Sequence, residues 1–226
     1  MEHLILIPKF KKNDKVGLSI DPIEYYINKL PNKKGCKKIQ AAISNYNGNT
    51  NVYYVAPDNI KKYNLPTWVR GCNSINNYHP TVSNLLSEKG VNIADIAITY
   101  EIPCKTLLNI IRENNVAGFY YLKIDTEGHD TVILENFCNN IKDNKHLPHK
   151  ILFESNLLSN KQDVNKVIEL LKEKGYDLIE SSHDTLLKLN LNNLKNKNNF
   201  MEAISNYYIM DYPQNITHII HHIKKI

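Results

Sequence analysis

Carboxylates and a histidine gather directly after one apolar segment near the middle of the chain. Residues 119–124 are apolar except for one lysine and predict a buried strand, and apolar residues resume behind it at helical spacing. In open α/β sheets, ligands bind beyond the carboxyl ends of the strands, so groups placed there are positioned for chemistry. The candidate catalytic residues are Lys123, Asp125, Glu127, His129 and Asp130.

Three roles are open for these side chains. One of the carboxylates, or His129, is a candidate general base that takes a proton from a hydroxyl group. Asp125 and Glu127, together with Glu154 at the end of a later apolar segment, form a candidate site for a divalent metal, because hard cations favour clustered carboxylates. The third interpretation is structural, since acids in the first turn of a helix cap it and interact favourably with its dipole.

A second acid follows an earlier apolar segment. Residues 16–20 predict a short strand that stops at Asp21 and Pro22, and apolar residues at helical spacing over 23–30 predict a helix. Asp21 suits a helix cap, and Pro22 suits the first helical position. Because parallel strands end at one edge of a sheet, we expect Asp21 to share a pocket with the carboxylates after residue 124.

Residues 56–95 follow no regular pattern and contain three prolines and the only tryptophan. A long irregular insertion in a compact domain is usually functional or mobile. Arg70, Ser74 and His79 are candidate contacts for an acidic or polyhydroxyl substrate, and the alternative is that they only tie down the loop. The aromatic residues form either a sugar-stacking surface or the segment's own small core; they are Tyr63, Trp68 and Tyr78.

Strand and helix alternate along the rest of the chain. This alternation predicts an α/β domain of three layers over residues 1–190, with a mostly parallel sheet and an antiparallel hairpin at one edge. Asn47 and Gly48, between two apolar segments, predict a further hairpin. Residues 191–226 form a tail whose packing the pattern does not predict. The other predicted elements are strands at 38–44, 52–55, 96–102, 150–153, 176–179 and 185–189, and helices at 107–111 and 164–171.

Composition narrows the class of protein. The chain has 226 residues, 42% of them hydrophobic, which is enough for one sizeable core. The net charge of +5 is modest and scattered, so nucleic acid binding is not indicated. The four cysteines are too far apart for a metal knuckle and favour free thiols in a reducing, cytoplasmic setting. The apolar patch at the amino end is too short for a signal peptide or a membrane span, and assembly into a homo-oligomer is left open.

The segments described above resemble the FkbM-type methyltransferases. YLKIDTEGHDTVILENF contains the Lys-Ile-Asp-x-Glu-Gly segment that marks this family. AISNYNGNTNVYYV, GCNSI, EIPCKTLLNII, ILFESN and GYDLIESSHDTLLKL resemble its other strands and loops, so the resemblance covers residues 16–189. It implies a Rossmann-like class I methyltransferase fold that binds S-adenosylmethionine and transfers a methyl group, usually to a hydroxyl of a sugar or natural product.

The resemblance also implies roles for particular residues. Asp21 would hold the ribose hydroxyls of the cofactor, because one carboxylate can accept from both. The residues after the third strand would lie against the adenine, and a small-molecule or glycan acceptor would complete the site. The cofactor-binding residues implied in this way are Asp21, Ala42, Ile43, Ser44 and Asp125.

One departure from the family concerns the first strand and the glycine turn after it. The only glycine before Asp21 is Gly17, inside the predicted second strand. Residues 8–15 are too few for the helical crossover of roughly a dozen residues that a parallel pair needs. We therefore expect the first strand and its glycine loop to be missing. Residues 4–7 are either a short strand or the end of a helix, and in the second case residues 2–10 are the remainder of the helix that follows the missing loop.

Two other functions remain open. Asp125-Thr126-Glu127 also resembles the acid-x-acid element with which glycosyltransferases hold a metal and a nucleotide-sugar diphosphate. A non-catalytic binding protein that kept the fold after losing the glycine loop is the other alternative. Stabilisation by S-adenosylhomocysteine, by a nucleoside diphosphate with manganese, or by neither would distinguish the three.

Overall fold

The computed structural model describes residues 4–7, 17–32, 34–75, 77–116, 120–190 and 192–193. Most of the tail predicted at 191–226 lies outside the described residues, as do residues 8–16. Within the described part, no helix is both long and apolar enough to cross a membrane.

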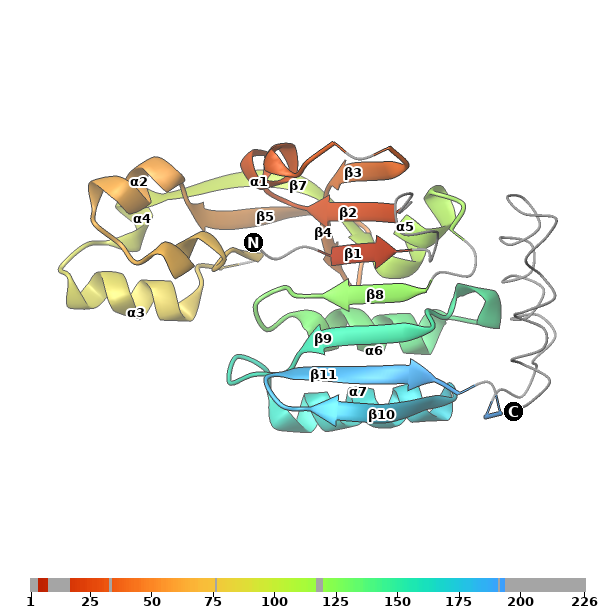
Figure 1. Ribbon diagram of the computed structural model, residues 1–226. Helices are drawn as coiled ribbons and strands as arrows, with labels where there is room; N and C mark the ends of the chain where they lie inside the picture. Colours follow the sequence, from red (N-terminus) through yellow and green to blue (C-terminus); the bar gives the residue numbers. More distant parts are fainter. Residues whose placement is uncertain are drawn as a thin grey trace.

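The main sheet has seven strands in the order β10-β11-β9-β8-β1-β2-β3 (Figure 1). Strands β2, β3, β8, β9 and β10 point one way, and β1 and β11 point the other way. Among the described strands of this sheet, only the β2–β3 and β8–β9 pairs are parallel, so the predicted mostly parallel sheet is a mixed one. The strands are β1 (Leu4–Ile7), β2 (Gly17–Asp21), β3 (Cys36–Gln40), β8 (Tyr121–Ile124), β9 (Lys150–Glu154), β10 (Tyr176–Ser181) and β11 (Asp184–Leu189).

Strand β1 lies between β2 and β8 and is antiparallel to both. Leu4 pairs with Ile20, and Ile5 pairs with Lys123. The prediction of a helical remnant is therefore wrong over β1, because an antiparallel pair needs no helical crossover and tolerates a short link. The reversal places the carboxyl end of β1 at the edge of the sheet opposite to Asp21. Strand β1 thus cannot deliver a glycine turn to the edge where β2 and β8 end.

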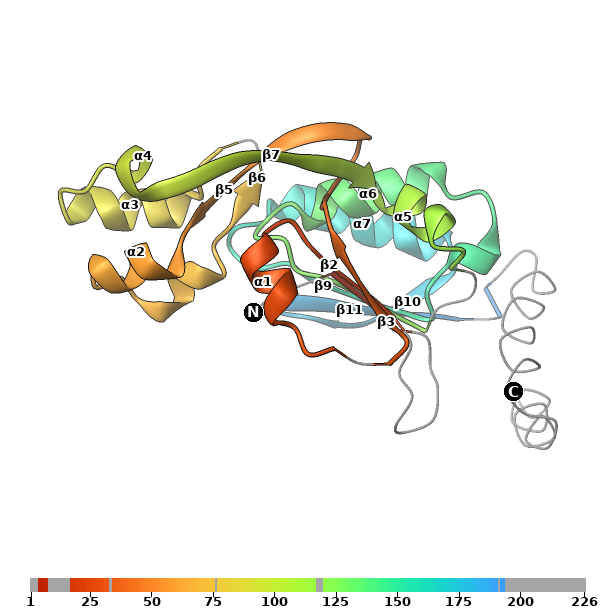
Figure 2. The same ribbon diagram turned by 90° about the horizontal axis from the view of Figure 1, so that it is seen from above.

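Three helices, α5, α6 and α7, cover one face of the main sheet (Figure 2). Phe137 and Leu171 on these helices are fully buried against strand residues such as Ile151. Successive strand residues point to opposite faces, and those on the other face, such as Lys123 and Leu152, are only half-buried. The described chain therefore forms a sheet covered on one face and not the predicted three layers. The helices are α5 (Leu107–Glu113), α6 (Asp130–Asn140) and α7 (Lys161–Glu173).

The segment predicted to be irregular, residues 56–95, folds together with Ile96 into a small helical unit that we call the helical arm. It is carried at the end of the long β5–β7 ladder, away from the main sheet (Figure 1). The arm has a core of its own around Val69 and Leu86, which are fully buried. Its elements are α2 (Pro57–Lys62), η1 (Thr67–Arg70), α3 (Pro80–Glu88) and α4 (Ile93–Ile96); the second sheet contains β4 (Ala42–Ser44), β5 (Gly48–Val55), β6 (Ser74–Ile75) and β7 (Ala97–Thr106).

The hairpin predicted at Asn47 and Gly48 is wrong. Strands β4 and β5 both pair with β7, in register with Cys104, so β7 lies between them. The Asn47 side chain accepts a hydrogen bond from the Thr106 backbone N–H at 3.0 Å and not from its own turn. The apolar run 38–44 divides into β3 and β4, which belong to different sheets.

The edge hairpin is confirmed, since β10 pairs with β11 and β11 pairs with β9. Helix α1 (Glu24–Lys29) begins two residues later than predicted. Asp21 Oδ1 accepts from the Ile23 N–H at 2.6 Å, so Asp21 fixes the backbone just before the helix. The same hydrogen bond holds the Asp21 carboxylate at the end of β2.

Candidate functional site

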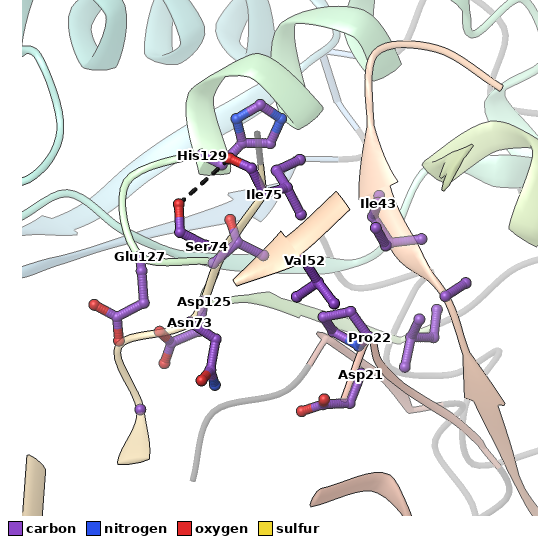
Figure 3. A pocket seen from close by; sticks show the side chains of 15 residues that line it. Asp21, Pro22, Ile43, Val52, Asn73, Ser74, Ile75, Asp125, Glu127 and His129 are labelled. Carbon is purple, nitrogen blue, oxygen red and sulfur yellow. Dashed lines mark hydrogen bonds between the residues drawn. The ribbon is translucent and has the colours of Figure 1, made fainter. Parts of the chain in front are cut away.

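The strands β2 and β8 end at the same edge of the main sheet, where their residues border a cavity of about 80 Å³. Asp21, the last residue of β2, is 4% exposed. Figure 3 shows Asp21 on one side of the cavity, with Asp125 and Glu127 on the other. The acids that follow the two strands therefore face one cavity, as the sequence predicted.

The wall between these acids is apolar. Ala42 and Ile43 of β4 and Val52 of β5 are buried and line it. Ser44 lies behind the wall, and its hydroxyl is 2.9 Å from His129 Nε2. Burial lowers the pKa of His129 below 6.5, so the imidazole is neutral at neutral pH. Ser44 thus orients a neutral histidine that lines the cavity.

The loop between β8 and α6 makes a sharp turn. Glu127 and Gly128 both have left-handed backbone conformations, with φ of 54° and 91°. A Cβ atom on Gly128 would lie 3.0 Å from the Leu158 carbonyl oxygen, so this position requires glycine. Glu127 is not a glycine, and residues held in this region cost about 1–3 kcal/mol and often belong to functional sites. The turn directs Glu127 toward the helical arm.

Asp130, which we predicted from the sequence as a catalytic candidate, is fully buried and does not line the cavity. Its Oδ2 accepts from the Thr126 N–H at 3.1 Å and from the Thr126 hydroxyl at 2.6 Å. Its Oδ1 accepts from the Glu154 N–H at 3.0 Å. Burial raises the pKa of Asp130 to about 6, against the opposing effect of these hydrogen bonds. Asp130 therefore ties the loop after β8 to the end of β9.

Lys123 also lies outside the cavity lining. Its Nζ donates to Asp125 Oδ2 at 2.7 Å, so it holds a carboxylate that lines the cavity. The predicted metal set is not brought together, since Glu154 Oε1 accepts from Asn156 Nδ2 at 2.5 Å and does not border the cavity. Within the described part of the chain, Glu127 instead meets Cys72 and His79, whose ligand atoms lie within 4.8 Å of one another.

The three predicted substrate residues lie in three different places. Ser74 lines the small cavity. Arg70 lines a neighbouring pocket of about 400 Å³, which shares Asp21, Asn73 and Glu127 with the first. His79 is buried, and its Nε2 is 3.3 Å from Glu127 Oε2. The arm therefore contributes a residue to each cavity and one to the cluster with Glu127.

The three aromatic residues of the arm divide between the two predicted alternatives, a stacking surface and a small core of the arm itself. Trp68 is 46% exposed and lines the larger pocket together with Tyr25 of α1. Tyr63 packs against the core of the arm, and Tyr78 makes an edge contact with Tyr53 at 5.0 Å between ring centroids. Only Trp68 of the predicted set is available to a ligand in this pocket.

Residues missed as site candidates are Cys72, Asn73 and Tyr25. The first two belong to the polar run 70–74, which contained the signal, because it departs from the apolar pattern around it. Tyr25 gave no such signal, since its place beside Trp68 depends on how α1 meets the arm.

One family of known proteins matches most of the chain. A family model described as the Methyltransferase FkbM domain matches residues 6–178. The matched range includes β2, β8, the loop after β8 and the whole helical arm. No curated protein and no solved structure matches the chain.

Proposed function

Since the chain belongs to the FkbM methyltransferase domain family, we propose that it transfers a methyl group from S-adenosylmethionine to a hydroxyl of a sugar or another small polar acceptor. The observation that carries this proposal is the single cavity bordered by Asp21 and Asp125. The family match favours this function over the glycosyltransferase alternative. S-adenosylmethionine would supply an electrophilic methyl group, which the acceptor oxygen would attack in line while S-adenosylhomocysteine leaves.

The residues around the cavity fit the adenosine half of this cofactor. Asp21 offers a carboxylate that can accept from two ribose hydroxyls. Ala42 and Ile43 offer an apolar surface for a base. The 80 Å³ cavity is smaller than the roughly 300 Å³ of small-molecule pockets, so entry of the whole cofactor requires the segment at Gly71–Asn73 between the two pockets to move.

The larger pocket supports a polar acceptor. Trp68 and Tyr25 expose aromatic rings there, and such rings pack against the apolar faces of sugars. Arg70 and Lys29 line the same pocket and can donate hydrogen bonds to hydroxyl or acidic groups. The pocket shares Asp21 with the cavity proposed for the cofactor, so acceptor and donor would lie side by side.

We assign the proton-accepting role to His129. Methyl transfer needs the acceptor hydroxyl aligned with the donor and relieved of its proton. His129 lines the cavity and is neutral, so one ring nitrogen carries a lone pair. Asp125 is held by Lys123 and is better suited to orient the substrates than to take a proton.

The test is thermal unfolding with S-adenosylhomocysteine. Ligand at a hundred times its Kd should stabilise the protein by about 2.7 kcal/mol. Asp21→Asn keeps the oxygen that accepts from Ile23, so it should weaken binding without unfolding the chain. Asp58→Asn, at an exposed position in the arm, is the matched control and should bind as the unaltered protein does.

Transfer of labelled methyl groups to a panel of sugars and polyhydroxyl compounds would then identify the acceptor. If the folded protein binds neither S-adenosylmethionine nor S-adenosylhomocysteine, the proposal is contradicted, and the alternative of a non-catalytic binding protein is favoured. Stabilisation by a nucleoside diphosphate with manganese would instead favour the glycosyltransferase.

A further inference from the structure

Cys72, His79 and Glu127 converge between the helical arm and the main sheet. Cys72 and His79 flank β6 in the arm, whereas Glu127 comes from the loop after β8. One ligand atom from each side chain lies within 4.8 Å of the other two. His79 Nε2 and Glu127 Oε2 are 3.3 Å apart. A thiol, an imidazole and a carboxylate therefore meet at one point.

His79 is buried beside Glu127, but its contact with that carboxylate is not a hydrogen bond. Its side chain is 3% exposed, and neither ring nitrogen makes a hydrogen bond. His79 is the N-cap residue of α3, yet its side chain makes no capping bond and turns toward Glu127. Buried polar groups left without a hydrogen bond are costly and are rare in native proteins.

Glu127 adds a second, independent constraint. Its side chain is 12% exposed, and burying a carboxylate is costly unless a positive charge or a metal compensates it. Its left-handed backbone, with φ of 54°, holds the carboxylate against the arm at some cost in energy. A cation between the three side chains would compensate both costs.

We propose that Cys72, His79 and Glu127 bind a divalent transition metal of the zinc type. Sulfur and nitrogen ligands select zinc-like ions over magnesium or calcium. Bonds of about 2.0–2.3 Å in tetrahedral geometry separate ligand atoms by roughly 3.3–3.8 Å, so the cluster needs to contract by about 1 Å at its widest. Three protein ligands leave a fourth position open, as in catalytic zinc sites.

The fourth position would face the two pockets, because Glu127 lines both of them. The metal would also join the arm to the loop after β8 and hold the arm beside the cavity. This inference does not depend on methyl transfer. Metal binding and cofactor binding can therefore succeed or fail separately.

The first test is a titration of the full chain with Co²⁺, which replaces zinc and is coloured. We expect one equivalent of Co²⁺ to give the visible bands of tetrahedral cobalt and a thiolate-to-cobalt charge-transfer band, both abolished by added Zn²⁺. Absence of the charge-transfer band in the unaltered protein would overturn the proposal and needs no variant.

The second test uses single substitutions with a matched cysteine control. Cys72→Ser should abolish the charge-transfer band, and His79→Gln and Glu127→Gln should each weaken metal binding by more than about 100-fold, since losing a group that only orients a ligand costs about 10–100-fold. Cys36→Ser alters another half-buried cysteine, and this variant should bind metal as the unaltered protein does. A band that persists in Cys72→Ser, or is lost in Cys36→Ser, contradicts the proposal. Circular dichroism of each variant establishes that it is folded.

Discussion

At the residue scale, the site depends on which groups face the cavity and which only hold them. Asp21 and Asp125 were predictable, because each follows a buried strand directly and strand ends meet at one edge. The roles of Asp130 and Lys123 were not, since sequence shows an acid or a lysine but not whether it points into the cavity. Asp130 turned out to bond Thr126 and Glu154 instead.

The proposed base gives a prediction about pH. His129→Gln should lower kcat by about 10²–10⁴-fold, the usual contribution of a general base, and leave S-adenosylhomocysteine binding nearly unchanged. Because burial lowers the pKa of His129, the base should be active at neutral pH and lose activity only as the pH falls below 6.5. The pH profile of kcat/KM measures this. A rate that still rises above pH 6.5 would count against His129.

Asp130 gives a prediction about stability. The pKa of Asp130 is 3.8 in the unfolded chain and about 6 in the folded protein. Between these two pH values, the folded protein therefore binds more protons than the unfolded chain does. Stability contributed by this group is therefore present at low pH and is lost as the pH rises from about 4 to 6, by roughly 3 kcal/mol.

Asp130→Asn removes the titrating group and should remove this dependence, although it also loses a hydrogen bond worth about 1–2 kcal/mol at every pH. Urea unfolding of both proteins from about pH 4 to pH 7 measures the difference between them. A difference that stays constant over this range would mean that Asp130 does not titrate as described.

At the element scale, strands that end in an acid were located to within about two residues, because a buried apolar run followed by polar residues is a strong signal. The direction of β1 was not predictable. Four apolar residues, Leu4–Ile7, carry no signal for direction, and only the short link to Gly17 limits the choice. The prediction of a hairpin at Asn47 was wrong for a related reason. The hydrogen-bond partner of Asn47 is Thr106, which is far away in the sequence.

The turn between β8 and α6 gives a prediction at this scale. Gly128→Ala places a Cβ atom 3.0 Å from the Leu158 carbonyl oxygen at φ of 91°. Gly90→Ala is the matched control, because Gly90 has φ of 67° and open space around it. We expect Gly90→Ala to lower the free energy of unfolding by about 1 kcal/mol and Gly128→Ala to lower it by about 2–3 kcal/mol. Urea unfolding measures both, and equal costs would argue against the contact with Leu158.

At the scale of the whole molecule, the described residues form a main core and an arm core joined by the β5–β7 ladder, which contributes to a third, smaller hydrophobic cluster. The main core lies between the seven-stranded sheet and α5, α6 and α7, and the arm has its separate core around Leu86. Composition predicted one core, because it counts apolar residues and does not show how a long ladder separates them. The site lies where the two parts meet, with Glu127 from one and Cys72 and His79 from the other.

Because the two cores are separate, we expect a substitution in one core to destabilise mainly the part of the protein that contains it. Leu86→Ala truncates a fully buried side chain in the arm core, and Phe137→Ala truncates one in the main core. Each should lower the free energy of unfolding of its own part by about 2–5 kcal/mol. Hydrogen exchange should show Leu86→Ala losing protection in α2, α3 and α4 while β8 and β9 keep theirs. Phe137→Ala should lower protection throughout the main sheet. If Leu86→Ala lowers protection in β8 and β9 as much as in the arm, the two cores unfold as one, because opening the arm would then require opening the sheet.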